Sequence, residues 1–196
     1  MNVSKSNRNI FAPLGASNHV DHEREENDFY ATDPRSIDAL LSVEDISSIV
    51  WENAAGDSHL ANRLIENGFS VRQTDLVIRN KNVTQQDFLT HKNDHLFCGD
   101  IITNPPYKFA GEWVTKSLDA IHEGQKVCLF LKLTFLESAK RRVLFDVLPP
   151  LRVHVFSKRI ACAKNGEFEG LGSSAACYAW FVWEKGNTNK TTIGWI

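Results

Sequence analysis

Four consecutive residues, Asn104-Pro105-Pro106-Tyr107, form the pattern with the clearest chemical meaning in the sequence. They follow the apolar residues 101–103, which predict the end of a strand, and the prolines stiffen the loop because each lacks an N–H and has a fixed φ. The side-chain carbonyl of Asn104 and the backbone carbonyl of Pro105 can together accept both hydrogens of an NH2 group. Tyr107 can stack on the planar group that carries this NH2. The pattern therefore indicates a site that binds a planar amine and directs its lone pair at an electrophile.

A turn of small residues forms a second pattern. The segment Glu52-Asn53-Ala54-Ala55-Gly56-Asp57 joins an expected strand to an expected helix and would let a ligand approach the N–H groups at the helix N-terminus. Asp75 lies nineteen residues after Gly56, at the end of the next expected strand, where a carboxylate can bind ribose hydroxyls. Asp87 and Phe88 follow a third expected strand and could bind and cover an adenine ring. Together these residues predict a nucleoside site beside the amine site.

At these residues the sequence resembles the amino-group S-adenosylmethionine-dependent methyltransferases, whose catalytic motif is Asn, Asp or Ser followed by two prolines and an aromatic residue. Over about residues 28–183 it looks closest to the small stand-alone DNA adenine-N6 methyltransferases of bacteria, phages and prophages. The resemblance implies S-adenosylmethionine as cofactor and methyl transfer to an exocyclic amine, namely N6 of adenine in DNA. It implies catalytic roles for Asn104, Pro105, Pro106 and Tyr107. It implies cofactor contacts for Tyr30, Thr32, Glu52, Ala54, Gly56, Asp57, Asp75, Leu76, Asp87, Phe88 and Asn104.

One position departs from the family pattern. Ser58 stands where such proteins commonly have a second glycine, and we expect its Cβ to crowd the cofactor. The sequence also has no segment long enough for a separate target-recognition domain, which predicts a short or relaxed target sequence.

Two other kinds of function stay open at this level. RNA adenine and the glutamine amide of a protein present the same NH2 group to residues 104–107, and a non-catalytic binding module could keep the cofactor fold. Other chemistries fit less well. None of the four cysteines follows a proline, as cytosine C5 methylation would favour, and the glycine patterns of nicotinamide and P-loop sites are absent.

Charge is distributed unevenly although the chain as a whole carries only −2. Residues 1–57 have a balance of −7 and residues 126–164 a balance of +7. A basic segment of this kind can provide the electrostatic footprint for phosphates, so we expect it to bind nucleic acid, DNA in the first instance. The cations expected to contact the substrate are Lys132, Lys140, Arg141, Arg142, Lys158, Arg159 and Lys164.

The elements that must position these residues alternate between strands and helices. Apolar runs and turn signals predict strands at 47–52, 69–76, within 80–92, 96–103, 126–133, 152–156 and 175–183, and helices at 34–41, 58–67, 109–122 and 138–147. This order predicts an α/β, Rossmann-like, doubly wound and mostly parallel sheet of about seven strands. No helix is expected between the last two strands, which predicts one antiparallel strand near the C-terminus. Residues 1–27 are expected to be a flexible arm and residues 28–196 a single methyltransferase domain.

Composition excludes several classes of protein. With 42% hydrophobic and 23% charged residues, the chain is neither disordered nor a membrane protein, since its longest uncharged apolar run, 127–131, is far shorter than a bilayer span. The polar N-terminus has no apolar signal core, so we expect the protein in the cytoplasm of a bacterial or phage-infected cell. The cysteines and histidines have no metal-ligand spacing, and no metal is expected.

Overall fold

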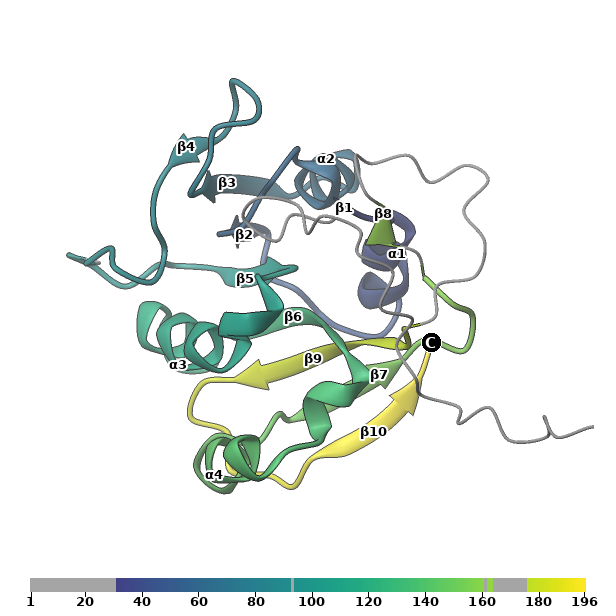
Figure 1. Cartoon of the computed structure of the whole chain (residues 1–196). Helices are drawn as coiled ribbons and strands as arrows, with labels where there is room; N and C mark the ends of the chain where they lie inside the picture. The colour runs from purple at the N-terminus through teal and green to yellow at the C-terminus, as the bar shows by residue number, and fades with distance from the viewer. Residues whose placement is uncertain (1–30, 93, 161, 164–175) are drawn as a thin grey trace, which may run out of the picture.

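The predicted helices and strands occur along the chain in the order that the sequence predicts (Figure 1). The computed structural model describes residues 31–92, 94–160, 162–163 and 176–196. The helices are α1 (Arg35–Leu41), α2 (His59–Glu66), α3 (Ala110–Ala120) and α4 (Ala139–Val147), with short 3-10 turns η2 (Tyr107–Phe109) and η3 (Leu133–Leu136). The strands are β1 (Ala31–Thr32), β2 (Ile49–Glu52), β3 (Ser70–Asp75), β4 (Thr84–Gln85), β5 (Asp100–Thr103), β6 (Lys126–Lys132), β7 (Arg152–Val155), β8 (Cys162–Ala163), β9 (Tyr178–Glu184) and β10 (Thr192–Trp195). The expected arm at 1–27, Tyr30 and Lys164 lie outside the described residues.

Eight strands form one sheet in the order β10-β7-β9-β6-β5-β2-β3-β4. Strands β4, β3, β2, β5 and β6 are parallel to one another, whereas β9 is antiparallel to both β6 and β7. The predicted α/β, Rossmann-like sheet with an antiparallel strand near the C-terminus is therefore confirmed. The chain leaves β2 toward β3 on one side and later returns to β5 on the other. The carboxyl ends of β2 and β5 thus form the switch point at which ligands bind in open α/β sheets.

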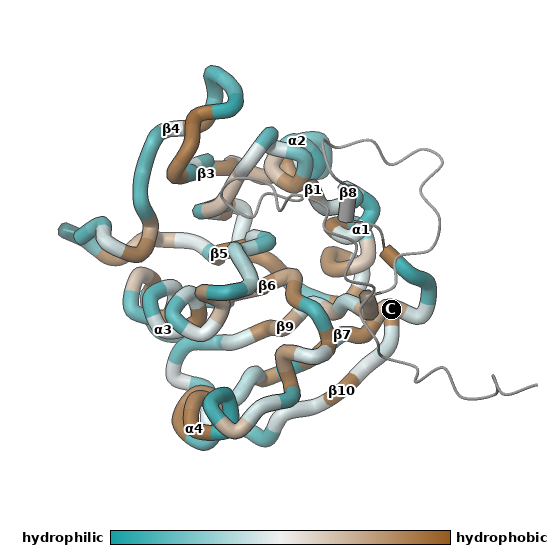
Figure 2. Tube along the Cα trace, viewed as in Figure 1, coloured by the Kyte–Doolittle hydropathy of each residue, from teal (hydrophilic) through white to brown (hydrophobic). Residues whose placement is uncertain are grey.

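Helices cover both faces of the sheet, with α1 and α2 on one side and α3 and α4 on the other (Figure 1). Successive strand residues point to opposite faces, so Trp51 packs in the core under α3 while Val50 packs under α1 and α2. Both side chains are almost completely buried. Figure 2 shows hydrophobic residues along β6 and β9 in the middle of the sheet and hydrophilic residues at the tip of the loop between β3 and β4. Strands buried on both faces give the continuous apolar runs from which they were predicted.

Three strands were not predicted. The edge strand β10 is parallel to β7, and the two-residue strands β1 and β8 pair antiparallel with each other outside the main sheet. β10 reads Thr-Ile-Gly-Trp, and most of it is exposed, so it lacks the apolar run of a buried strand. A two-residue strand is too short for any periodicity to be visible in a sequence.

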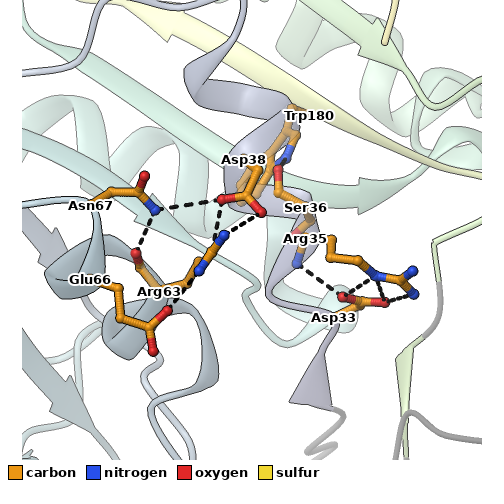
Figure 3. A network of polar contacts seen from close by, with 8 residues as sticks. All are labelled: Asp33, Arg35, Ser36, Asp38, Arg63, Glu66, Asn67 and Trp180. Atoms are coloured by element: carbon orange, nitrogen blue, oxygen red, sulfur yellow. Dashed lines mark hydrogen bonds and ion pairs between the residues drawn. The ribbon is translucent and has the colours of Figure 1, made fainter.

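Helices α1 and α2 are joined by the polar network drawn in Figure 3. Arg63 of α2 donates to both oxygens of Asp38 in α1, at 2.8 and 2.9 Å, and also to Glu66 at 2.8 Å. Asp33 accepts the Arg35 N–H at 2.9 Å and so caps the first turn of α1. These bonds hold α1 in place directly after β1, a segment that reaches the candidate site described below.

A buried carboxylate ties the amino end of the sheet together. Glu44, which follows α1, accepts a hydrogen bond from Arg152 Nη2 at 2.7 Å and lies 3.1 Å from Lys126 Nζ. His154 Nε2 lies 2.8 Å from its Oε1. Burial raises the pKa of the Glu44 carboxyl, but the hydrogen bonds from His154, Arg152 and Lys126 outweigh this effect and bring the pKa down to about 2.

Candidate active site

A cavity of about 350 Å³ lies at the carboxyl ends of the parallel strands, beside the switch point. It has the size of a site for a small molecule or cofactor. The predicted site residues that line it are Thr32, Glu52, Ala54, Asp75, Leu76, Asp87, Phe88, Asn104, Pro105, Pro106 and Tyr107. Residues far apart in the sequence therefore meet in one place, because parallel strands put all their carboxyl ends at the same edge of the sheet.

The loop 104–107 leaves β5 and enters η2 directly. The Asn104 Nδ2 group donates to the hydroxyl oxygen of Thr32 at 2.8 Å, so this amide is oriented by a residue of β1. The Phe109 N–H donates to the Pro106 carbonyl at 2.9 Å, which closes the turn after the prolines. Pro105 is buried, while Asn104 and Tyr107 are partly exposed. Hydrogen bonds thus anchor the loop at both of its ends.

Tyr107 lies between aromatic and cationic side chains at the rim of the cavity. Its ring centroid is 6.2 Å from that of Tyr178, with an angle of 36° between the ring planes. The ammonium group of Lys132, at the end of β6, lies over the Tyr107 ring at 5.1 Å from the centroid. A cation in this position is attracted by the negative face of the ring.

The small-residue turn after β2 is attached to the end of β3. The Gly56 N–H donates to Asp75 Oδ2 at 2.8 Å, and the other oxygen of Asp75 accepts the Val77 N–H at 2.9 Å. Arg79, which also lines the cavity, has its Nη1 atom 3.3 Å from Asp75 Oδ1. Gly56 and Asp57, which were expected to contact the cofactor, are not among the residues that line the cavity. A carboxylate offers about four acceptor positions, so Asp75 can still accept hydrogen bonds from a ligand.

Ser58 does not line the cavity, contrary to the crowding expected from its Cβ. Its backbone has φ of 67°, in the left-handed region where glycine is favoured, which fits the glycine common at this position. The hydroxyl group points toward β3, where it donates to Gln73 Oε1 and accepts from Asn80 Nδ2 at 2.8 Å. These two polar partners keep the side chain away from the cavity.

Two consecutive buried residues, Glu52 and Asn53, are among those that line the cavity. Among the described residues, Glu52 Oε2 and Asn53 Nδ2 have no hydrogen-bond partner, whereas Asn53 Oδ1 accepts the Trp113 indole N–H at 2.8 Å. Burial raises the pKa of the Glu52 carboxyl well above its ordinary value, the Ala61 N–H opposes this shift, and the charge of Asp75 adds to it. Sequence reasoning missed Asn53, although its place directly after the strand could have indicated it.

Phe88 and Asp87 stand at the other end of the cavity and differ in burial. Phe88 is only 2% exposed and packs edge-on against Trp51, with 5.4 Å between ring centroids. Asp87 is exposed and accepts the Leu89 N–H at 3.1 Å, so it shapes the turn after β4. Lining residues that the sequence did not single out here are Arg79, Gln86, Leu89 and Thr90.

The predicted basic residues do not form one uniform face. Lys132 lies beside Tyr107, and Lys140, Lys158 and Arg159 are exposed. Arg141 differs, because its Nη1 group donates to the carbonyls of Thr134, Phe135 and Glu137 and its guanidinium lies over the Phe135 ring. Arg142 pairs with Asp146 at 2.7 Å on the surface of α4. The Arg141 Nη1 group thus holds η3 against α4, and a phosphate contact by this side chain stays a prediction.

Within the described ranges, no three His, Cys, Asp or Glu side chains come together as ligands for a metal ion. None of the helices in the described part of the chain is long and apolar enough to cross a bilayer.

Solved structures that are similar to this chain include methyltransferases and a putative hemolysin. A putative class I S-adenosylmethionine-dependent methyltransferase from Listeria monocytogenes matches with a TM-score of 0.58 and 10% identity, over 83% of this chain. The chain spans 64% of the length of that protein. A predicted O-methyltransferase from Agrobacterium tumefaciens matches with a TM-score of 0.57 and 14% identity, over 83% of this chain and 85% of the other. A putative hemolysin from Lactococcus lactis matches with a TM-score of 0.53 and 9% identity, over 82% and 91%.

These similarities concern the fold, since the identities are low. No protein-family model matches the sequence, and a search of curated proteins finds no match. The chain has the Rossmann-like fold of class I methyltransferases, and its chemistry must be argued from its own site.

Proposed function

We propose that this chain is an S-adenosylmethionine-dependent methyltransferase that modifies an exocyclic amine, with N6 of adenine in DNA as its substrate. One observation carries the proposal. The stiff loop 104–107, with its amide and aromatic ring, lines the same cavity as the carboxylates of Glu52 and Asp75. The residues proposed to bind the amine and those proposed to bind the nucleoside thus line one cavity, as transfer of a group from a nucleoside cofactor to an amine requires.

The cavity residues fit S-adenosylmethionine. Glu52 Oε2 can accept from an ammonium group and Asn53 Nδ2 can donate to a carboxylate, so these two buried atoms complement the amino-acid end of the cofactor. Asp75 can accept from ribose hydroxyls, and Leu76 and Phe88 provide apolar contact for the adenine. When bound, the cofactor supplies a methyl group on a sulfonium, which is already electrophilic.

The chain itself then has to present the amine. Asn104 Oδ1 and the Pro105 carbonyl accept the two N–H groups, which raises electron density on nitrogen and aims its lone pair. Their dipoles also stabilise the positive charge that develops on nitrogen. No strong base is needed for the transfer itself, because the methyl group is transferred from a positively charged sulfur. In-line positioning supplies a large share of the rate in reactions of this kind.

A nucleic-acid substrate is supported by the surroundings of Tyr107. The ring offers a stacking surface for a base that leaves the duplex, and Lys132 places a positive charge beside it. Exposed Lys140, Lys158 and Arg159 add positive charge to the basic segment. Such cations do not distinguish the phosphates of RNA from those of DNA, so the preference for base and sugar must be tested directly.

The test is methyl transfer from isotopically labelled cofactor to DNA, RNA and a glutamine peptide, read by mass spectrometry of the released nucleosides and the peptide. We expect N6-methyladenine from DNA, and Asn104→Ala should abolish it while the protein stays folded. Asn62→Ala is the matched control, since Asn62 is exposed on α2 and does not line the cavity. If only RNA or only the peptide were labelled, that molecule would replace DNA as the proposed substrate. If the protein bound the cofactor but labelled none of the three, a non-catalytic binding module would be favoured.

A further inference from the structure

The hydroxyl group of Thr32 contacts the amide that the mechanism uses. Asn104 Nδ2 donates to Thr32 Oγ1 at 2.8 Å, across seventy-two positions of the sequence. We propose that Thr32 is a positioning residue, which holds the Asn104 amide so that Oδ1 faces the target amine. The proposal rests on the proposed function and gives Thr32 a role distinct from the cofactor contact that the family resemblance implies.

Thr32 is suited to this role because its own position is fixed. It is only 2% exposed, and its backbone pairs with Cys162 of β8. The next residue, Asp33, is also 2% exposed and caps α1 through the Arg35 N–H (Figure 3). A side chain held on both sides by pairing and capping loses little entropy when it binds Asn104.

The orientation of the amide matters for the chemistry. An asparagine side chain has one carbonyl end and one NH2 end, and only the carbonyl end can accept a hydrogen from the substrate amine. Because Thr32 takes the NH2 end, the carbonyl end is directed to the other side. If the amide turned over, two NH2 groups would face each other and neither could accept. In the observed contact the Thr32 hydroxyl accepts from the NH2 end of Asn104, which leaves the carbonyl end for the substrate amine.

The experiment compares Thr32→Val, which removes the hydroxyl at nearly constant volume, with Thr32→Ser, which keeps it. We expect Thr32→Val to lower kcat at saturating cofactor by about 10- to 100-fold, the range for a small misplacement of a reacting group. The dissociation constant of S-adenosylmethionine should stay within about twofold. Thr32→Ser should restore most of kcat, which a purely structural defect would not predict.

Thr74→Val is the matched control. Thr74 is 1% exposed and its hydroxyl accepts the Trp51 indole N–H at 2.9 Å, so the same substitution removes a buried hydrogen bond away from Asn104. It should lower the melting temperature without lowering kcat. An NMR readout independent of turnover is the Asn104 side-chain amide in 15N-asparagine-labelled protein, whose signal should shift and exchange faster in Thr32→Val.

The outcomes separate the two proposals. An active parent protein whose Thr32→Val variant keeps kcat, or loses only cofactor affinity, would overturn the positioning role and leave the proposed function standing. An Asn104 amide signal unchanged by Thr32→Val would also overturn it. A parent protein that binds the cofactor but methylates no amine would overturn the proposed function instead, whatever the NMR spectrum shows.

Discussion

The Glu52 carboxyl group stands at a place where a negative charge is costly to the folded protein and useful to a cationic ligand. It is 2% exposed, its Oε2 has no partner among the described residues, and its pKa is raised by burial. A raised pKa in the folded state means that the folded protein binds more protons than the unfolded one above the ordinary carboxyl pKa of 4.5. Stability is therefore expected to fall as pH rises above that value toward the raised pKa.

Glu52→Gln separates these two effects. The amide has no charge to desolvate, so we expect the free energy of unfolding at pH 7 to rise by about 0.5–2 kcal/mol. The binding of S-adenosylmethionine should weaken by about 1.5–3 kcal/mol, because a hydrogen bond to a charged group is lost. Urea unfolding and calorimetry measure the two quantities. A variant that binds the cofactor as tightly as the parent would refute the role of Glu52.

Tyr107 gives a second prediction at this scale. Tyr107→Ala should weaken binding of a short adenine-containing oligonucleotide by about 1–3 kcal/mol, which is the contribution of one aromatic stacking contact. Tyr107→Phe keeps the ring, and we expect binding close to that of the parent. Fluorescence anisotropy at fixed salt measures both variants. If Tyr107→Ala bound as well as Tyr107→Phe, the ring would not be the stacking surface.

At the scale of elements, α4 combines cations with different surroundings. Arg141 closes η3 through backbone carbonyls, while Lys140 is exposed and Arg142 makes only a surface ion pair. A surface pair of this kind contributes little to stability, so the Arg142 side chain can turn to a phosphate at small cost. The same helix thus has a structural cation next to two that a nucleic acid can reach.

The two kinds of cation should respond differently to substitution. Lys140→Glu combined with Arg142→Glu should weaken binding to all DNA sequences alike, and should flatten the slope of log affinity against log salt by about 0.9 for each lost phosphate contact. Arg141→Ala should instead lower the free energy of unfolding by about 0.5–1.5 kcal/mol, because it removes the hydrogen bonds to the carbonyls at η3. Salt titrations and urea unfolding distinguish the two. A stable double variant with an unchanged salt slope would exclude α4 from the nucleic-acid interface.

At the scale of the whole molecule, the ionisation of Glu44 makes the stability of the folded protein depend on pH. Its pKa in the folded protein is about 2, below the ordinary 4.5. The folded state therefore binds fewer protons than the unfolded state, and the stabilisation is fully present above pH 4.5 and is lost as pH falls toward 2. Glu44→Gln should cost about 2–3 kcal/mol at neutral pH, since it leaves the partly buried cations Arg152 and Lys126 without their carboxylate.

The measurement is the free energy of unfolding between pH 2 and pH 7. We expect the difference between parent and Glu44→Gln to shrink steadily below pH 4.5. Glu66→Gln is the control, because Glu66 forms an exposed ion pair with Arg63 and should change stability by less than about 0.5 kcal/mol. A constant difference across the pH range would show that the ionisation of Glu44 is not the cause.

The sequence by itself determined which strands lie in the core and where the loop 104–107 occurs. The apolar runs at β5 and β6, the proline pair at 105–106 and the acid that ends β3 are visible locally, because periodicity and turn chemistry depend on neighbouring residues. The alternation of elements determined the sheet in the same way. Much of the candidate cavity could thus be predicted from short patterns, each of which lies at or directly after the end of a parallel strand.

Only the tertiary structure decided the contacts between distant residues. It shows that Asn104 donates a hydrogen bond to Thr32, that Ser58 donates to Gln73 and that Arg141 donates to carbonyls at η3. It also added β10 and paired β1 with β8, elements too short or too exposed for a sequence pattern to reveal. The physical reason is that a polar side chain has the same donors and acceptors wherever it stands. Which partner it meets is decided by the packing of the whole chain.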